Sequence, residues 1–310
     1  MTRTLPTMRR AAAVTLATGA LLSVSALAAP AQAATAPTVS AKGAFLLNNA
    51  SSATVYSKAA DTRRQMASTT KIMTAAVVLS TKGVDLNRKV TVKQAYRDYV
   101  TKEGASTADL RTGDKMTVRQ LLYATLLPSG CDAAYALADT FGSGSTTAAR
   151  TKSFVSKMNA KATELKLKNT KFDSFDGISG GGNNYSTPRD LAKVAQYAMK
   201  NTNFRTVVKA TSYKASAPAS NGGTRTYTWY NTNKLLGSYK GAIGIKTGTG
   251  TAAGPCLIFA ATRGSKTVVG VILNGSDRYK DAAKILDYGF GSSTAKTMKL
   301  RTLPSDAQQD

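Results

Sequence analysis

The segment STTKIMTAAVVLS at positions 68–80 is apolar on nearly every side after its first turn. A helix without a polar face has no side to present to water, so this pattern predicts a buried central helix that other elements surround. Hydrophobic residues make up 42% of the 310 residues, a fraction typical of a packed globular protein that can supply the surrounding core.

The segments around that helix divide into strand-like ends and a helical middle. Residues 82–205 show mostly helical spacing, and the turn Ser186-Thr187-Pro188 predicts the start of a helix that runs to Met199. Short runs with the composition of β-strands lie on both sides of this middle, at 43–49, 54–57, 209–216, 224–230, 242–247, 256–262 and 267–273.

This order predicts an α+β fold in which both ends of the chain contribute to one mostly antiparallel, five-stranded sheet covered by helices. The sheet and its helices would form an α/β lobe of about 43–81 and 205–290, and an all-helical lobe would span about 82–204. Residues 43–290 would then be one domain with a ligand cleft between its lobes. We expect a linker at 34–42 and a loose polar tail at 291–310.

The first 33 residues have the pattern of a signal peptide. Arg3, Arg9 and Arg10 precede an apolar run of small residues, and Ala31-Gln32-Ala33 matches an Ala-x-Ala cleavage site. We predict cleavage after Ala33 and export to the extracellular or cell-wall side, where the protein would be soluble. A retained membrane anchor is the alternative, but Thr and Ser residues dilute the apolar run.

The chain is strongly basic. It has 42 Lys and Arg against 17 Asp and Glu, a formal charge of +25, and removal of residues 1–33 takes away three arginines and no acid to leave +22. Such a charge favours polyanionic surroundings, so anionic cell-wall polymers are possible partners. The basic residues are scattered singly and carry no nucleic-acid signature, so we expect no nucleic-acid partner.

The chain contains no histidine and two cysteines. This composition excludes Ser-His-Asp and Cys-His catalysis, histidine-ligated metals, zinc–thiolate clusters and iron–sulfur clusters. We therefore expect neither a metal nor a cofactor, and any chemistry has to use Ser, Thr, Tyr, Lys, Arg and carboxylate groups.

Ser68-Thr69-Thr70-Lys71 opens the predicted buried helix. Residues three apart share a helix face, so the Lys71 amine can reach the Ser68 hydroxyl. Burial disfavours the charged form of a lysine, which makes a neutral amine available as a general base, and a serine with a base in reach is an activated nucleophile. The backbone N–H of Ser68 at the helix start could stabilise an oxyanion. A second SxxK at 293–296 lies in the polar tail, where nothing buries its lysine.

Two further short motifs could complete a site. Lys246-Thr247-Gly248 ends a predicted strand and is followed by Thr249, so that Lys246 adds positive charge and the threonines add hydroxyls. Glycine at position 248 would let a ligand approach the strand backbone closely. Ser129, in a loop that turns into a helix, could relay a proton from the rim of the cleft.

The ordered set SxxK, SxN-like and KTG resembles the penicillin-binding protein and serine β-lactamase superfamily. In detail it is most similar to the low-molecular-weight D-alanyl-D-alanine carboxypeptidases of peptidase family S11. The resemblance covers about residues 43–290, and the matching blocks are MASTTKIMT at 66–74, PSGCDAA at 128–134, YSTPRDLA at 185–192, NTNKLL at 231–236 and GIKTGT at 244–249.

The resemblance implies a penicillin-binding fold and a serine peptidase that acts on the D-Ala-D-Ala end of peptidoglycan stem peptides. Ser68 would attack the carbonyl of the penultimate D-alanine, Lys71 would accept the proton, and Ser129 would pass it to the departing D-alanine. Water as the second acceptor gives carboxypeptidation and an amine gives transpeptidation. β-Lactam antibiotics would acylate Ser68 and be hydrolysed slowly.

The resemblance also implies how the substrate is held. Lys246 and Thr247 would face its terminal carboxylate, next to Gly248, and Arg278 lies where related enzymes have a carboxylate-binding arginine, although it could equally be a surface residue. The backbone N–H groups of Ser68 and Thr249 would form the oxyanion hole.

One position departs from the family pattern. The family has asparagine where this chain has Cys131, and a thiol is a weak donor and a weak acceptor compared with an amide. Hydrolysis by water is therefore expected to suffer, which favours a transpeptidase-leaning enzyme. Cys131 could also be a second nucleophile or half of a disulfide with Cys256, but we expect two free, buried thiols.

Two alternatives to a D-Ala-D-Ala peptidase remain at this point. A class A-like β-lactamase would need a glutamate to activate water, and the only glutamates are Glu103 and Glu164, of which we interpret Glu164 as a surface residue. A non-catalytic protein of the same fold could bind wall polymers through its charge, but the intact Ser68, Lys71 and Lys246 argue against it.

Overall fold

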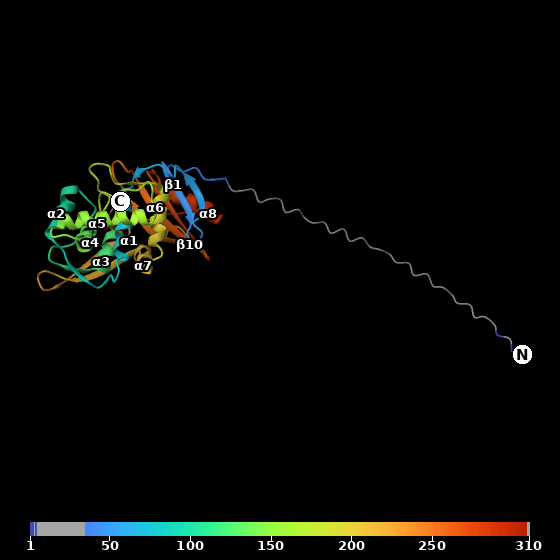
Figure 1. The fold of residues 1–310 in the computed structure, drawn as a ribbon, viewed down its shortest axis with the longest axis horizontal. Helices are drawn as coiled ribbons and strands as arrows, with labels where there is room; N and C mark the ends of the chain where they lie inside the picture. Colours follow the sequence, from blue (N-terminus) through green and yellow to red (C-terminus); the bar gives the residue numbers. More distant parts are fainter. Residues whose placement is uncertain (3, 5–34, 309–310) are drawn as a thin grey trace. The chain divides into compact units, whose positions relative to one another are not determined.

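The computed structural model describes residues 1–2, 4 and 35–308, so all but three residues of the predicted signal peptide lie outside the described part of the chain. The described residues from Thr35 onward belong to a single unit (Figure 1). Within the described residues, no helix has both the length and the hydrophobicity that a membrane crossing needs.

A five-stranded antiparallel sheet is the centre of the fold. Its strand order is β2-β1-β11-β10-β9, and β1 pairs with β11 in a register that places Phe45 opposite Val271. The predicted sheet, built from both ends of the chain, is confirmed. Its strands are β1 (Gly43–Asn48), β2 (Thr54–Lys58), β9 (Ala242–Gly248), β10 (Cys256–Arg263) and β11 (Lys266–Leu273).

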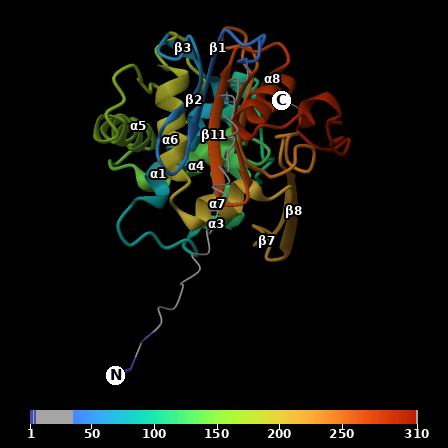
Figure 2. The same ribbon diagram turned by 90° about the vertical axis from the view of Figure 1, so that its right-hand side faces the viewer.

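Successive side chains of a strand point to opposite faces of the sheet, and both faces of this sheet are covered by a hydrophobic core. Leu46 and Phe259 pack into the core that includes α8 (Arg278–Phe290), whereas Phe45 and Ile258 join the larger core on the other side. Figure 2 shows the sheet between α8 and α6. The catalytic candidates lie on the side of the larger core.

The helix α1 (Lys71–Leu79) runs through that larger core, and all nine of its residues are buried. It contacts most of the helices that follow it, which confirms the expectation of a surrounded central helix. A 3₁₀ turn, η1 (Ala67–Thr70), leads into it. The other helices of this side are α2 (Gln94–Glu103), α3 (Val118–Leu126), α4 (Cys131–Phe141), α5 (Thr147–Glu164), α6 (Pro188–Ala198) and α7 (Thr202–Lys209).

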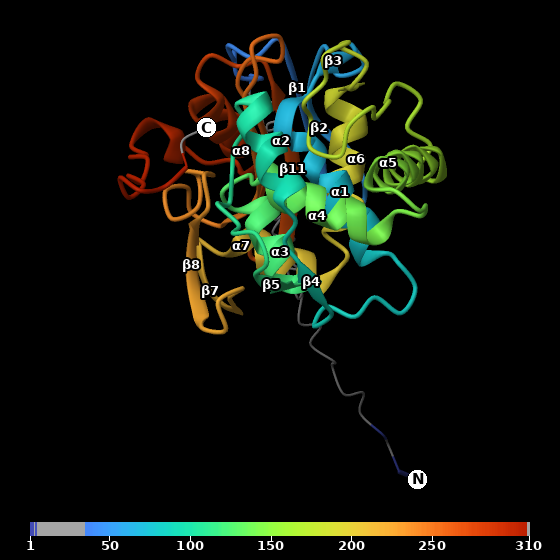
Figure 3. The same cartoon turned by 90° about the vertical axis from the view of Figure 1, so that its left-hand side faces the viewer.

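The helical middle is not all-helical, which corrects one expectation. The antiparallel pair β4 (Lys89–Thr91) and β5 (Lys115–Thr117) forms within it, and its β6 (Tyr185–Ser186) pairs with β3 (Arg64–Gln65) from the preceding segment. These strands have two or three residues, so they show no alternation that a sequence pattern can reveal. The hairpin β7 (Ser212–Pro218) and β8 (Thr224–Tyr230) stays separate from the five-stranded sheet, and β7 contacts β5 (Figure 3).

Two segments expected to be loose pack onto the domain instead. The backbone N–H groups of Ser40 and Ala41 donate to the Asp281 carboxylate at 3.0 and 2.9 Å, so residues 39–42 are not a free linker. In the C-terminal tail Leu303 is buried, and the Gln308 side chain accepts from the backbone N–H of Thr107 at 3.0 Å. Both contacts join residues more than 200 positions apart, which local composition cannot predict.

Candidate active site

Ser68 and Lys71 lie where η1 passes into α1, one turn apart. Lys71 Nζ donates a hydrogen bond to Ser68 Oγ at 2.8 Å and a second to the backbone carbonyl of Asp176 at 3.1 Å. The Lys71 side chain is fully buried at the start of a helix whose other residues, apart from Thr74, are apolar. The arrangement holds the amine on the serine oxygen, which is the contact that proton transfer needs.

The residue whose carbonyl binds Lys71, Asp176, also has a buried carboxylate with hydrogen-bond donors of its own. Asp176 is fully buried, and its carboxylate accepts hydrogen bonds from the Tyr99 hydroxyl at 2.8 Å and from the backbone N–H of Ile178 at 3.0 Å. Burial and the neighbouring Asp176 carboxylate raise the pKa of Tyr99 well above its ordinary value, so the tyrosine stays a hydrogen-bond donor.

Cys131 begins α4 next to this group. Burial raises the pKa of its thiol to about 12, against the opposing effect of Lys71 and with the help of Asp176. The thiol is therefore protonated at neutral pH and is not a second nucleophile in its resting state. Cys131 and Cys256 are both buried and form no disulfide in the described part of the chain, as expected.

Ser129 precedes Cys131 in a tight turn. Its backbone is left-handed (φ 68°), and its Oγ is buried without a hydrogen-bond partner among the described residues. An unpaired buried hydroxyl is costly, and it is available to a substrate or a proton in transit. The turn is fixed by Asp132, whose carboxylate accepts from the backbone N–H groups of Ala108 at 2.9 Å and Leu110 at 3.0 Å.

The KTG motif lies at the end of β9, against η1. Lys246 is buried, with its Nζ donating to the Thr247 carbonyl at 3.0 Å. A Cβ on Gly248 would come within 3.0 Å of the Ser68 backbone nitrogen, so glycine is needed for the strand to approach the nucleophile. Arg278, the first residue of α8, donates to the Thr249 hydroxyl at 2.8 Å, which places it beside this motif rather than on an open surface.

Ser68 opens onto a cleft of about 440 Å³. Ser68, Cys131 and Thr249 line it, together with the end of α2 and the loops at 104–106, 177–179 and 250–253. Four more of the nine residues that the sequence singled out contact these three: Lys71 and Gly248 approach Ser68, Arg278 bonds Thr249, and Ser129 lies against Cys131. Lys246 and Thr247 precede Gly248 in β9 and are not among the lining residues.

Sequence reasoning missed four residues of this site. Asp176 contacts Lys71 and Tyr99 contacts Asp176, Glu103 lines the cleft, and Gly177 packs so tightly that a Cβ would lie 2.0 Å from the Ala67 carbonyl oxygen. The glycine-rich stretch at 177–182 signals close backbone approach, but it does not say against what. Nothing in the spacing of the other three points to Ser68.

Known proteins resemble this chain over most of its length. The profile of a peptidase family, S11, described as D-alanyl-D-alanine carboxypeptidase, matches residues 30–277. A D-alanyl-D-alanine carboxypeptidase of Streptomyces sp. strain K15 is 58% identical over 288 residues, which are 91% of this chain and 99% of that protein.

Solved structures agree with the sequence comparison. The crystal structure of the Streptomyces K15 DD-transpeptidase superposes with a TM-score of 0.82 at 60% identity, covering 83% of this chain and all of that one. A penicillin-binding protein homologue from Mycobacterium tuberculosis superposes with a TM-score of 0.72 at 30% identity, covering 85% and 96% of the two chains.

Proposed function

Since this chain belongs to the D-alanyl-D-alanine carboxypeptidase family, peptidase family S11, we propose that Ser68 is its nucleophile and Lys71 the base that activates it. The observation that carries the assignment is the 2.8 Å contact between Lys71 Nζ and Ser68 Oγ. The enzyme is a serine peptidase that acts on the D-Ala-D-Ala end of peptidoglycan stem peptides through an ester on its serine.

The first half of the reaction forms that ester. Lys71 takes the proton of Ser68 as Oγ attacks the carbonyl carbon of the penultimate D-alanine, and the backbone N–H groups of Ser68 and Thr249 hold the oxyanion. The C–N bond then breaks, and the departing D-alanine takes up the proton through Ser129. The unpaired Oγ of Ser129 and its place beside Cys131 support this relay.

The positive groups behind the cleft would hold the free carboxylate of the substrate. Lys246, Thr247 and Gly248 end β9 beside the nucleophile, and Arg278 fixes the hydroxyl of Thr249. A carboxylate at this end of the substrate places its scissile bond at Ser68. This arrangement explains a preference for cleavage at a chain end.

In the second half, water or an amine attacks the ester carbonyl and regenerates Ser68. We propose that transfer to an amine is favoured over hydrolysis, because the thiol of Cys131 cannot hold water or the substrate carbonyl as an amide would. Incubation of an acyl-D-Ala-D-Ala peptide with and without glycine or a diamino acid measures the product ratio. Hydrolysis that is undiminished by added amine would contradict the preference.

Labelled penicillin tests the nucleophile, because a β-lactam mimics the substrate and leaves a covalent adduct. Intact protein is expected to be labelled and Ser68→Ala is not. The second SxxK provides a matched control: Ser293 lies outside the cleft lining, and Ser293→Ala is expected to be labelled like the parent. Labelling that survives in Ser68→Ala would exclude the assignment.

The β-lactamase alternative predicts fast turnover of the adduct. Glu164 is exposed and paired with Lys161 at 2.6 Å, as interpreted from the sequence, so it does not serve the site. We expect the penicillin adduct to persist, and rapid catalytic hydrolysis of penicillin would favour the alternative.

We also propose that residues 1–33 direct export and are removed, leaving a catalytic domain of residues 43–290 on the extracellular or cell-wall side. The basic n-region and Ala31-Gln32-Ala33 support this. The N-terminal sequence of the secreted protein is expected to begin at Ala34, and its mass is expected to match residues 34–310.

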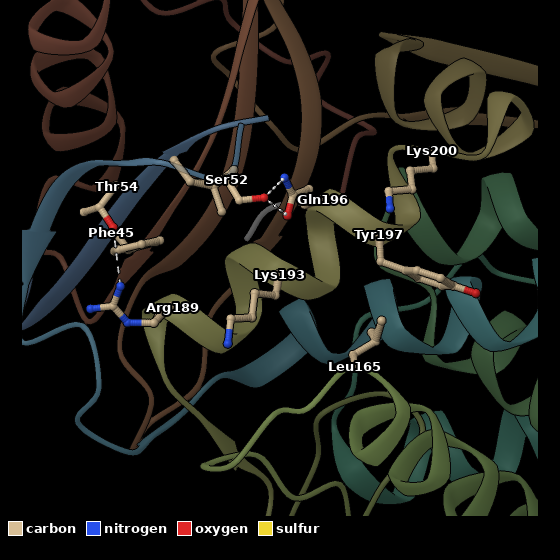
Figure 4. A pocket seen from close by; sticks show the side chains of 10 residues that line it. Phe45, Ser52, Thr54, Leu165, Arg189, Lys193, Gln196, Tyr197 and Lys200 are labelled. Atoms are coloured by element: carbon tan, nitrogen blue, oxygen red, sulfur yellow. Dashed lines mark hydrogen bonds between the residues drawn. The ribbon is translucent and has the colours of Figure 1, made fainter. Parts of the chain in front are cut away.

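The face of α6 is the surface best suited to anionic wall polymers, which we propose as partners. Arg189, Lys193 and Lys200 follow one another along a groove of about 330 Å³ between α6 and the β1–β2 hairpin (Figure 4). Arg189 is engaged with Asp61 at 2.8 Å, whereas the ion pair of Lys193 with Asp190 is longer, at 3.9 Å, so Lys193 is held less tightly than Arg189. Sedimentation with walls that contain or lack phosphate-rich polymers measures binding, and Lys193→Gln with Lys200→Gln is expected to weaken it.

A further inference from the structure

Glu103 is the one charged side chain among the described residues that line the catalytic cleft. The other lining residues, on the walls that also carry Ser68 and Thr249, are polar, apolar or glycine. The cations of the site, including Lys71 and Lys246, are buried behind these walls. A ligand that fills the cleft beyond the nucleophile therefore meets a single negative charge.

Helix stability does not explain this carboxylate. Glu103 is the last residue of α2, and the carboxyl end of a helix is its negative pole, where an acid is disfavoured. Its ion pair with Lys102 is long, at 3.6 Å, and the lysine is 82% exposed, so the pair is weak and can be exchanged. The carboxylate is free to bind another cation.

The backbone around Glu103 is fixed relative to the nucleophile. Gly104 ends α2 in a left-handed conformation, and the N–H of Ala105 returns to the carbonyl of Val100 at 3.0 Å. Three residues after Glu103, the carbonyl of Ser106 accepts from the backbone N–H of Cys131 at 2.8 Å. The carboxylate is thus carried on a scaffold that is bonded to the catalytic turn.

The direction of the substrate decides which part of it meets Glu103. Lys246 and Thr247 hold the terminal carboxylate on one side of Ser68 in the function proposed above, on which this inference rests. Ser68 lines the cleft between the end of α2 and residues 250–253, whereas Lys246 and Thr247 are not among its lining residues, so the remainder of the acyl donor has this cleft to extend into. The residue that precedes D-Ala-D-Ala is the first part of the donor to enter it.

We propose that Glu103 selects acyl donors that carry an ammonium group on the residue preceding D-Ala-D-Ala. A carboxylate within a partly enclosed cleft attracts such a group and orients the donor before acylation. Glu103 is therefore a specificity residue for the donor and takes no part in proton transfer at Ser68.

Two donors separate charge from shape. N-acetyl-L-Lys-D-Ala-D-Ala has a free ε-ammonium, and its Nε-acetylated counterpart has the same backbone without the charge. We expect the parent enzyme to prefer the free amine by about fivefold in kcat/KM, the scale of a solvent-accessible ion pair. Glu103→Gln is expected to remove the preference, and 0.5 M salt to reduce it in the parent.

Matched variants make the result specific. Asp98→Asn removes an exposed acid from the same helix outside the cleft lining, and it is expected to keep the preference. Glu103→Lys is expected to reverse it, so that an Nε-succinylated donor with a terminal carboxylate becomes the better substrate.

The inference is overturned if the parent enzyme treats both donors alike or if Glu103→Gln retains the preference. It is also overturned if Glu103→Gln slows release of the penicillin adduct, because the carboxylate would then act on water. Penicillin labelling of Ser68 is read in the same samples. Its absence would instead contradict the proposed function, so the two failures are distinguishable.

Discussion

Tyr99 and Asp176, 77 residues apart in the sequence, are joined by a 2.8 Å hydrogen bond from the tyrosine hydroxyl to the carboxylate. The carbonyl of the same aspartate accepts from the amine of Lys71. The pair therefore connects α2, whose last residue lines the cleft, with the segment that contacts Lys71.

Tyr99→Phe tests this connection by removing only the hydroxyl. The buried carboxylate loses a donor worth roughly 1.5–3 kcal/mol, so the free energy of unfolding is expected to fall by about that amount. If loss of this hydrogen bond also displaces Asp176 and with it Lys71, acylation by penicillin is expected to slow by about tenfold. Stopped-flow acylation and urea denaturation measure the two effects.

Tyr135→Phe is the control, because its ring packs against Tyr99 at 5.3 Å and it lies on the neighbouring helix α4. It is expected to acylate like the parent. An unchanged acylation rate in Tyr99→Phe would show that the pair is structural only.

Gly177→Ala is expected to disturb the nucleophile through the backbone. The added Cβ would lie 2.0 Å from the Ala67 carbonyl oxygen, and the residue has a positive φ of 102°. Relief of such overlap costs roughly 1–3 kcal/mol and displaces the turn that carries Ser68. We expect a lower Tm and at least a tenfold slower acylation by penicillin.

Gly180→Ala provides the comparison within the same loop, since a Cβ there meets nothing within 4 Å. It is expected to leave Tm and acylation unchanged. Equal effects of the two substitutions would mean that loop flexibility, rather than contact with the nucleophile, is responsible.

Cys131→Asn introduces an amide in place of the thiol. An amide can donate to the substrate carbonyl and accept from Lys71, whereas the protonated thiol does both weakly. The ratio of hydrolysis to amine transfer is expected to rise. Product analysis with an acyl-D-Ala-D-Ala donor measures it, with Cys256→Ala, the other buried thiol, as control. An unchanged ratio counts against the role assigned to the thiol.

The carboxyl group of Asp139 is expected to make the free energy of unfolding fall at acid pH. Burial alone would raise the pKa of this carboxyl, but hydrogen bonds from Arg150 at 2.6 Å, Lys93 at 2.5 Å and Tyr96 outweigh burial and hold the pKa below its ordinary 3.8. A carboxyl with a lowered pKa in the folded state stabilises the fold above the unfolded pKa and loses that contribution as pH falls through the folded value.

Asp139→Asn is therefore expected to lower the free energy of unfolding by roughly 2 kcal/mol at pH 7. Its difference from the parent is expected to shrink as pH falls below about 4, because the parent carboxyl becomes protonated. Urea denaturation between pH 3 and 7 measures both effects, with Asp98→Asn as the exposed control. A difference that is constant over this range would refute the linkage.

The parts of the fold and site that the sequence predicts are those with a local signature. The contact between Ser68 and Lys71 follows from i, i+3 spacing, and the strands of the sheet follow from β-rich runs bounded by glycine turns. Gly248 could be predicted because only a glycine lets the KTG strand approach another backbone.

The parts that the sequence does not predict depend on contacts between distant segments. Asp176 reaches Lys71 across 105 positions, and Tyr99 reaches Asp176 from a third element. The tail was expected to be loose because it is polar, yet Gln308 caps a backbone N–H 201 positions away. No spacing rule encodes such meetings, because they arise only when the packed core brings the segments together.

The pairing of β1 with β11 has a consequence for the order of events during synthesis and folding. The first strand of the domain finds its hydrogen-bonding partner only when residues 266–273 are available, so a growing chain cannot assemble the sheet early. The KTG strand belongs to the same sheet and meets the nucleophile only within it. Catalytic competence should therefore arise late and all at once, and a nascent or C-terminally truncated chain should remain inert toward its substrate and toward penicillin.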